Sequence, residues 1–310
     1  FFVGGKNMAE PDDLYTLRAQ FWLGHYDMAL DEARSIARRP MAQSLKDERE
    51  EIVVRCHLAK GDADRAVAET AGHANPGMKA LNIQANNTLS PSDANVDAMK
   101  ALLADPSSAA SATPTLGLVA AHLLLSAGKT SDALACVASG SFMEHQALAL
   151  QIYIKIDRID LAKQQLDTMR AADEDAILPQ LGSAYVDIAN GSSTAADAIH
   201  HLATLQEQYG ASLMLLNSAA VAHMTAGNYS EAEMSLSEAN AEFNGAADAD
   251  TLVNTVVCYQ HMGRSAADID PILSALKSQF PAHPFVEGLK RVEGALERES
   301  IKYKVEAIVA

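Results

Sequence analysis

The sequence predicts an all-α fold: a right-handed α-solenoid of about eight helix-turn-helix repeats that ends in a C-terminal capping helix. A turn signature recurs along most of the 310-residue chain, and the intervals fit two short helices each. Only 5% of the residues are aromatic, whereas sheet-rich chains favour β-branched and aromatic residues. Because a solenoid grows by adding repeats, length alone does not divide the chain, and we expect one domain over residues 1–310.

The repeated turn starts with glycine in all but one copy and usually carries an alanine five positions later. Copies occupy residues 24–29, 61–66, 128–133, 157–162 and 227–232, with a weaker copy at 263–268 and a longer turn at 190–194. Their successive positions, counted from 191 in the longer turn, differ by 37, 67, 29, 34, 36 and 36 residues. The gap of 67 residues spans two periods, so a hidden repeat should turn near residues 90–93. This period is typical of tetratricopeptide repeats.

Each position of the turn has a physical role. Glycine ends the first helix because it adopts the left-handed conformation without a Cβ penalty, and the next polar residue helps to cap the second helix. The alanine allows the two helices to approach closely, since only small side chains fit where backbones cross. We therefore expect Ala232 to face Ala220, with Leu236 and Ala239 filling the groove behind them.

Along the chain, residues 10–113 are expected to form irregular N-terminal repeats and residues 114–280 regular repeats, with the cap at 281–310. The serine- and alanine-rich segment 105–111 reads as a flexible connection between the hidden repeat and the next one. Two prolines within 281–284 stop one helix, and the charged segment 285–305 reads as the final helix. A charged terminal helix is how a solenoid covers its open end.

The charge and the cysteines restrict the class of function. A net charge of -16 argues against sequence-independent binding of nucleic acid or anionic membranes. The one basic cluster, Arg34, Arg38 and Arg39, lies beside acidic residues and reads as a solvated helix face. Three isolated cysteines in apolar helical contexts suit buried, reduced thiols and hence the cytosol. No apolar run is long enough to span a bilayer, and the first residues lack the features of a signal peptide.

The sequence offers no reaction centre, so we expect no enzyme, no metal site and no cofactor. The triplet Gly128-Lys129-Thr130 resembles the end of a phosphate-binding loop, but that loop needs a glycine where Leu123 stands. Cys258 and His261 could supply half a zinc site, but no second pair with matching spacing follows. The acidic and histidine clusters 173–175 and 200–201 lack partners at catalytic spacing.

The remaining candidate site is a groove for another protein. In this repeat type the first helix of each pair lines the concave side. The predicted partner-binding residues of this groove are Leu118, Leu125, Ile154, Tyr185, Ile188, Asn217, Val221, Met224 and Val257. The alternative is that these side chains pack within and between the repeats. A co-chaperone that clamps a carboxylate tail would need basic groove residues, and only Lys155 and Asn217 would suit that role.

Several segments resemble the epsilon subunit of the coatomer coat. The first is 155–162, which continues through 169–170 and 173–176 to 180–181. Segments 251–254, 260–263 and 283–285 are similar to the C-terminal part of that family, and residues between 13 and 24 to its beginning. The resemblance covers nearly the whole chain and is weakest from 72 to 114.

The resemblance implies a non-enzymatic, cytoplasmic subunit of the COPI vesicle coat that wraps and stabilises the C-terminal domain of the alpha subunit of coatomer. It further implies Golgi-to-endoplasmic-reticulum and intra-Golgi transport, with contact to Golgi and vesicle membranes only through the assembled coat. An apolar groove in an acidic solenoid fits an obligate protein partner. Two alternatives stay open: a generic tetratricopeptide adaptor or co-chaperone that binds another protein's tail, and an enzyme on a helical scaffold, which would need a polar pocket with a perturbed acid or metal site.

Overall fold

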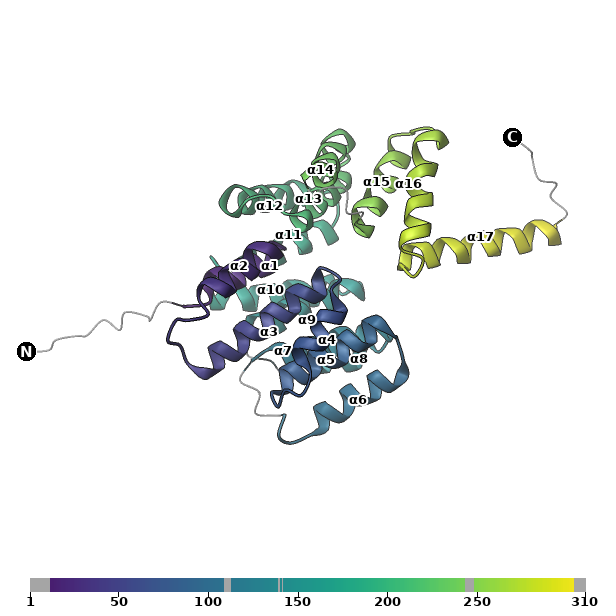
Figure 1. The fold of residues 1–310 in the computed structure, drawn as a ribbon. Coiled ribbons are helices and arrows are strands. Elements are labelled where there is room, and N and C mark those ends of the chain that lie inside the picture. Colours follow the sequence, from purple (N-terminus) through teal and green to yellow (C-terminus); the bar gives the residue numbers. More distant parts are fainter. Residues whose placement is uncertain (1–11, 109–112, 139, 141, 243–247, 304–310) are drawn as a thin grey trace, which may run out of the picture. The chain divides into compact units, whose positions relative to one another are not determined.

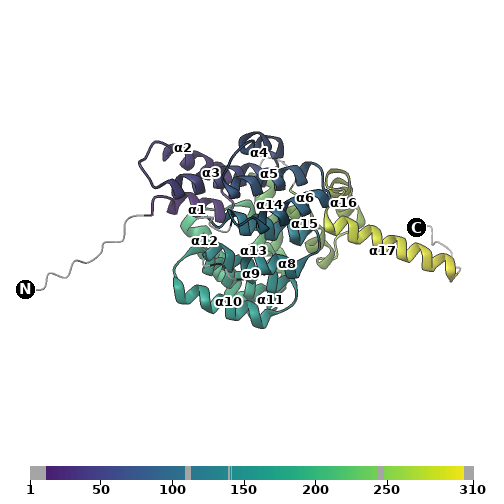
Figure 2. The ribbon, with the colours of Figure 1, turned by 90° about the horizontal axis from the view of Figure 1, so that it is seen from below.

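The computed structural model describes residues 12–108, 113–138, 140, 142–242 and 248–303. These residues form seventeen helices and no strand (Figures 1 and 2). The helices are α1 (Tyr15–Trp22), α2 (Tyr26–Ser35), α3 (Gln43–Ala59), α4 (Ala63–Thr70), α5 (Pro76–Leu89), α6 (Asp93–Ala104), α7 (Thr115–Ser126), α8 (Thr130–Val137), α9 (Met143–Lys155), α10 (Ile159–Ala172), α11 (Ile177–Ala189), α12 (Ala195–Tyr209), α13 (Leu213–Ala226), α14 (Tyr229–Glu242), α15 (Ala249–His261), α16 (Ala266–Gln279) and α17 (Pro284–Lys302).

The helices follow one another as eight pairs plus a final single helix, as the repeat pattern predicts. Neighbouring helices along the chain pack on one another, as in α7 with α8, α9 with α10 and α13 with α14. The hidden repeat is the pair α5 and α6, which turns between Leu89 and Asp93. The longer turn at 190–194 separates α11 from α12.

The chain divides into two compact parts, residues 1–190 with 207–210, and residues 191–206 with 211–310. The first part holds α1 to α11 and the last turn of α12; the second holds the rest of α12 and α13 to α17. The single solenoid domain expected over residues 1–310 stays a prediction.

The turns confirm the predicted role of glycine. Gly24, Gly61, Gly128 and Gly227 all have a φ between 72° and 84°, as expected for residues that end a helix in the left-handed conformation. In the fifth turn an aspartate takes this place, and Asp157 has a φ of 58°. A side chain with a Cβ is disfavoured there, so this turn carries a strain that its glycine counterparts avoid.

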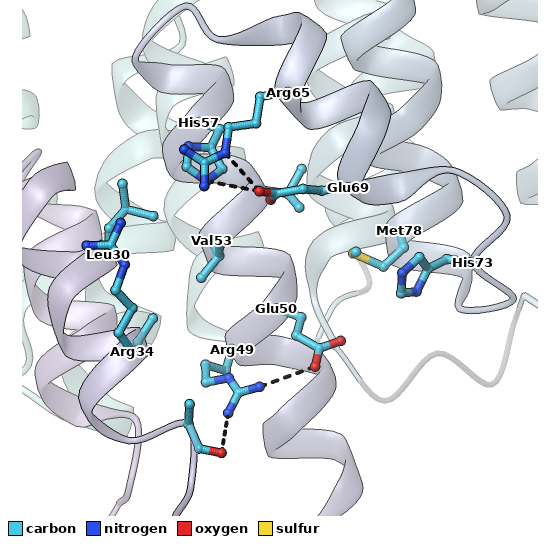
Figure 3. A pocket seen from close by; sticks show the side chains of 13 residues that line it. Leu30, Arg34, Arg49, Glu50, Val53, His57, Arg65, Glu69, His73 and Met78 are labelled. Carbon is cyan, nitrogen blue, oxygen red and sulfur yellow. Dashed lines mark hydrogen bonds and ion pairs between the residues drawn. The ribbon is translucent and has the colours of Figure 1, made fainter.

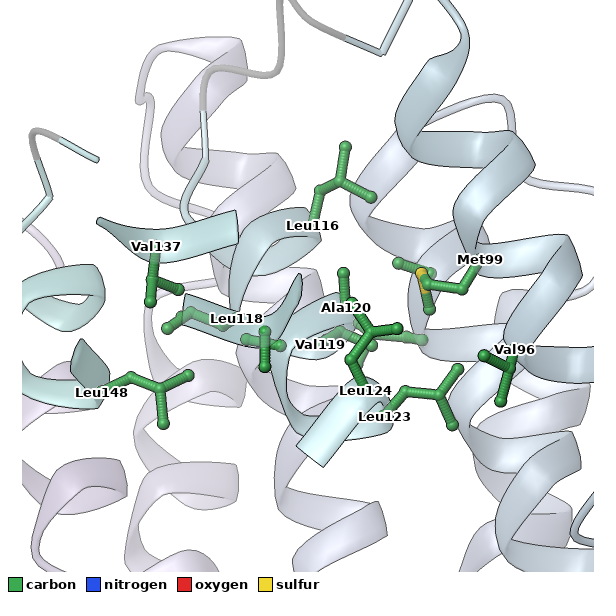
Figure 4. Packing of buried hydrophobic residues seen from close by; sticks show 14 of the residues in the cluster. Val96, Met99, Leu116, Leu118, Val119, Ala120, Leu123, Leu124, Val137 and Leu148 are labelled. Carbon is green, nitrogen blue, oxygen red and sulfur yellow. The ribbon is translucent and has the colours of Figure 1, made fainter. Parts of the chain in front are cut away.

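Within each part, buried clusters join the two helices of a pair and successive pairs. In the first part, Leu124 of α7 packs in one buried cluster with Met99 of α6 and Leu148 of α9 (Figure 4). In the second part, Ala220, Ala232 and Leu236 share a cluster, which confirms the predicted close approach of α13 and α14, and Ala239 is 1% exposed. A small side chain at each crossing is therefore a condition for packing.

Two boundaries depart from expectation or lie outside the described residues. The final helix ends at Lys302 rather than at residue 305, which is itself outside the described residues. Residues 109–112 of the predicted connection at 105–111 also lie outside them, whereas Asp105 to Ser108 form a turn after α6. Among the described residues, no helix is long and apolar enough to cross a membrane.

Candidate partner-binding surface

All nine predicted groove residues lie on the first helix of a pair. Five of them belong to the first part of the chain: Leu118 and Leu125 on α7, Ile154 on α9, and Tyr185 and Ile188 on α11. The other four belong to the second part: Asn217, Val221 and Met224 on α13, and Val257 on α15. Most are half-buried, which leaves part of each apolar side chain open to a partner.

Leu118 and Asn217 differ from the rest because both are buried. Leu118 is 4% exposed and belongs to the same core cluster as Leu124, so in this structure it stabilises the repeats. Asn217 is 8% exposed, and its Nδ2 donates to Leu213 O at 3.0 Å and to Thr251 Oγ1 at 2.8 Å. Its Oδ1 accepts a hydrogen bond from Asn254 Nδ2 at 2.9 Å, so its polar groups join α13 to α15.

The first helix of the chain meets the surface on which Ile154 lies. Trp22 packs against the cluster that includes Leu150 and Leu166, beside the half-buried Ile154. Trp22 also donates from Nε1 to Glu144 Oε1 at 2.6 Å, and α1 contacts α11 (Figure 1). The N-terminal repeat thus folds back onto helices that come more than 120 residues later, as the Trp22–Glu144 separation of 122 residues shows.

An ion pair reinforces this contact. Arg55 of α3 pairs with Glu144 of α9, with 2.9 Å between NH2 and Oε2, and its guanidinium lies 4.4 Å from the centre of the Phe21 ring. The Arg55 and Glu144 side chains are 15% and 8% exposed, so the charges face each other with little water between them. The repeat pattern does not predict the contact that these residues make. The only feature of the sequence that could have drawn attention to it is Trp22, the single tryptophan of the chain.

In the second part, three half-buried residues remain as candidate partner contacts. Val221 and Val257 occupy equivalent positions on α13 and α15, 36 residues apart, and neither belongs to the Ala220–Ala232 cluster. Met224 does pack against that cluster, so replacing it would also disturb the α13–α14 crossing. Substitutions of Val221 and Val257 therefore test partner binding with less disturbance of the α13–α14 packing than a substitution of Met224.

A pocket between α2, α3, α4 and α5 is the strongest alternative site (Figure 3). Its volume is about 320 Å³, and apolar side chains such as Val53 and Met78 line it together with three arginines. The arginines already have partners: Arg34 pairs with Asp31 at 2.7 Å, and Arg49 and Arg65 each pair with a glutamate on their own helix at 3.2 and 2.9 Å. An anionic ligand in this pocket would therefore meet a carboxylate beside each arginine, which weakens the attraction of the arginines for it.

The pKa values of Glu51 and Cys56 reflect burial rather than catalytic pairing. Burial raises the pKa of the Glu51 carboxyl, which accepts a hydrogen bond from Thr113 Oγ1 at 3.1 Å. Burial also raises the pKa of the Cys56 thiol to about 12, which keeps it protonated and unreactive. His261 stacks on Tyr229 with 5.1 Å between ring centres. No group of three or more potential metal ligands occurs among the described residues.

Sequence comparisons with known proteins all find the same family. The family described as "Coatomer epsilon subunit" matches residues 10–304. Coatomer subunit epsilon-1 of Arabidopsis thaliana is 33% identical, over 94% of this chain and 97% of the relative. Coatomer subunit epsilon of Dictyostelium discoideum is 27% identical, over 92% and 97%.

Solved structures show the fold alone. A tetratricopeptide repeat protein from Parabacteroides merdae has a TM-score of 0.53 at 12% identity, over 89% of this chain and 95% of that one. A chain of the APC/C hetero-tetramer Cut9-Hcn1 has a TM-score of 0.57 at 14% identity, over 92% and 56%. The chain therefore has a tetratricopeptide-like all-α fold.

Proposed function

The chain belongs to the coatomer epsilon-subunit family, and from this premise we propose that it binds and stabilises the C-terminal domain of the alpha subunit of coatomer. As a family member it is a subunit of the COPI coat. The match over residues 10–304 is the observation that carries the proposal, because it spans all but the ends of the solenoid. In this role the chain is a structural subunit and performs no reaction.

Half-buried apolar residues on the first helices are the proposed contact surface. In the second part, Val221 and Val257 lie 36 residues apart on α13 and α15; in the first part, Tyr185 of α11 precedes Val221 by the same interval in the sequence. Burial of apolar surface drives most protein association, and a partner that binds only the folded state of alpha stabilises that state by mass action. Ile154 supports a further expectation: a partner that reaches α9 must share this surface with Trp22.

The place of action follows from the proposed partner. We expect the chain on the cytosolic side of Golgi and COPI vesicle membranes, where it acts in Golgi-to-endoplasmic-reticulum and intra-Golgi transport. Contact with the membrane is indirect, through the assembled coat. A net charge of -16 supports this, since a chain with such an excess of acidic residues is repelled by anionic lipid.

The test is co-purification from eukaryotic lysate with tagged chain. We compare wild type with Val221→Glu/Val257→Glu, which places charges on the proposed contact surface. The matched control is Met234→Glu, because Met234 is an equally apolar residue that is 64% exposed on the second helix α14. Circular dichroism melting shows whether each variant folds.

Stoichiometric recovery of the alpha subunit with wild type and the control, but not with the double variant, is the expected result. Recovery of chaperones instead of coat subunits would favour a generic adaptor and reject the proposal. Recovery of the alpha subunit by all three proteins would keep the partner and reject the two valines as its contacts.

A further inference from the structure

The final helix α17 is joined to the rest of its part of the chain by few contacts. Only Val286 of its nineteen residues is buried. Beyond this anchor, Lys277 of α16 pairs with Glu293 at 3.1 Å, and Lys290 Nζ donates to Pro281 O at 3.3 Å. Most of α17 therefore extends away from α16 (Figures 1 and 2).

A heptad pattern runs along α17 to its C-cap residue, Tyr303. Spacings of 4, 3, 4, 3 and 4 residues link Phe285, Leu289, Val292, Leu296, Glu299 and Tyr303, and we call this set the seam. This is the spacing of the core positions of a coiled coil. Phe285 and Leu289 are half-buried, whereas Val292, Leu296 and Tyr303 are 61%, 72% and 68% exposed. The C-terminal part of the seam therefore presents uncovered apolar side chains.

We propose that the seam docks one amphipathic helix of the alpha coat subunit, with a lysine or arginine of that helix facing Glu299. This inference rests on the proposed function, since it assigns a second contact with the same partner. The heptad spacing selects a helix as the occupant, because knobs at alternate intervals of three and four residues fit holes on another helix. The carboxylate at a core position selects a basic residue opposite it.

A second copy of this chain fits the seam poorly. A parallel pair would set Glu299 against its own counterpart, which is repulsive at a core position. An antiparallel pair centred between Val292 and Leu296 would set Glu299 against Leu289 and bury a carboxylate on an apolar side chain. A basic residue on a different protein removes both penalties, and it needs to displace only the exposed pair of Glu299 with Lys302 at 3.2 Å.

Because the seam is short, we expect its partner to be held already by another surface of this chain. Residues 285–303 provide fewer than three heptads, and a coiled coil usually needs at least three or four. A second contact within one complex needs much less affinity, because the first contact raises the effective concentration of the helix to about the millimolar range. The subunit held by the rest of the chain is therefore the protein most able to supply the helix.

The experiment measures dissociation of the full chain from the alpha subunit by biolayer interferometry. Val292→Glu/Leu296→Glu should increase the dissociation rate at least ~10-fold, the effect of losing the second of two linked contacts. The control is Ile301→Glu, because Ile301 is 73% exposed on the same helix but lies off the seam. It should leave the rate unchanged. All three positions are exposed, so folding is preserved.

A zero-length carbodiimide cross-link tests the charge pairing in the wild-type complex. Mass spectrometry should find Glu299 joined to a lysine of the alpha subunit. Glu297, which lies off the seam, should not be joined and serves as the control. If the residue opposite Glu299 is an arginine, no cross-link forms there, and Glu299→Lys should instead accelerate dissociation more than Glu297→Lys.

The outcomes separate this inference from the proposed function. If wild type does not bind the alpha subunit, the proposed function fails and the inference fails with it. If wild type binds and the seam variant dissociates at the wild-type rate, only the inference is overturned. If light scattering shows that wild type is a dimer that the seam variant dissociates, the seam is occupied by a second copy and the inference is again overturned.

Discussion

At the scale of single residues, the turn at Asp157 is the clearest departure from the repeat pattern. Its φ of 58° is the only positive value among the described non-glycine residues, and six other repeat turns use glycine there. Asp157→Gly should therefore raise the free energy of unfolding by about 0.5–1 kcal/mol, because glycine adopts this conformation without Cβ strain. Urea unfolding measures the change. Gly128→Asp, the reverse substitution in another turn, should lower it by a similar amount.

The buried carboxyl of Glu51 predicts a pH dependence of stability. Burial raises its pKa in the folded state above the ordinary value of 4.5, so the folded chain binds more protons than the unfolded chain in the window just above that value. Stability contributed by this group is therefore full below pH 4.5 and is lost as the pH rises through the folded pKa. Glu51→Gln should remove this slope.

We expect Glu51→Gln to gain stability relative to wild type as the pH rises above 4.5 and through the raised pKa of the folded protein. Any packing cost of the amide is independent of pH and shifts both ends equally. Parallel urea titrations at several pH values give the difference. A difference that stays constant over this range would mean that Glu51 is ionised in the folded protein without cost.

At the scale of helices, the contact between α1 and α9 should hold the N-terminal repeat in place. Trp22→Ala removes both the packing against the cluster that includes Leu150 and Leu166 and the hydrogen bond to Glu144, and should cost about 2–4 kcal/mol, somewhat below the range for a fully buried tryptophan. Hydrogen exchange should rise in α1 and α2, and in α9 at the site of contact. Trp22→Phe keeps an aromatic ring but loses the indole N–H, and should lose about 1–2 kcal/mol. Unchanged exchange in α1 would show that its contacts with α2 and α3 suffice.

The helices could be predicted from the sequence, but their long-range contacts could not. Turn chemistry is local, so glycine and the alanine at position 232 fixed where the helices end and cross. Periodicity gives the direction of a side chain and not its depth, which is why the repeat pattern predicts Leu118 and Asn217 at the groove although both are buried. The hydrogen bond between Trp22 and Glu144 joins residues 122 positions apart, and a repeat pattern predicts contacts only between neighbouring repeats.

For the molecule as a whole, the net charge of -16 predicts that salt stabilises the free chain. Repulsion between the acidic residues weakens once the screening length falls to about 10 Å at 0.1 M salt. The exposed ion pairs lose strength at the same time, but each is worth only about 0–1 kcal/mol. The melting temperature should therefore rise by a few degrees, roughly 2–5 °C, between 10 mM and 300 mM sodium chloride. A fall would mean that the ion pairs outweigh the repulsion.

The salt dependence of binding also distinguishes a coat subunit from a tetratricopeptide co-chaperone, the alternative role that the sequence leaves open for this chain. A co-chaperone that clamps a carboxylate tail binds through charges, so its affinity should fall several-fold between 50 mM and 300 mM salt (about one to two pairs screened). An apolar surface around Val221 and Val257 binds by removing hydrocarbon from water, which salt does not weaken. We therefore expect the dissociation constant for the alpha subunit to change less than about 3-fold over this range when measured by calorimetry. The same titrations should give a negative heat-capacity change, the mark of buried apolar surface. A steep loss of affinity with a small heat-capacity change would assign the binding energy to charged residues and place the contact away from the two valines.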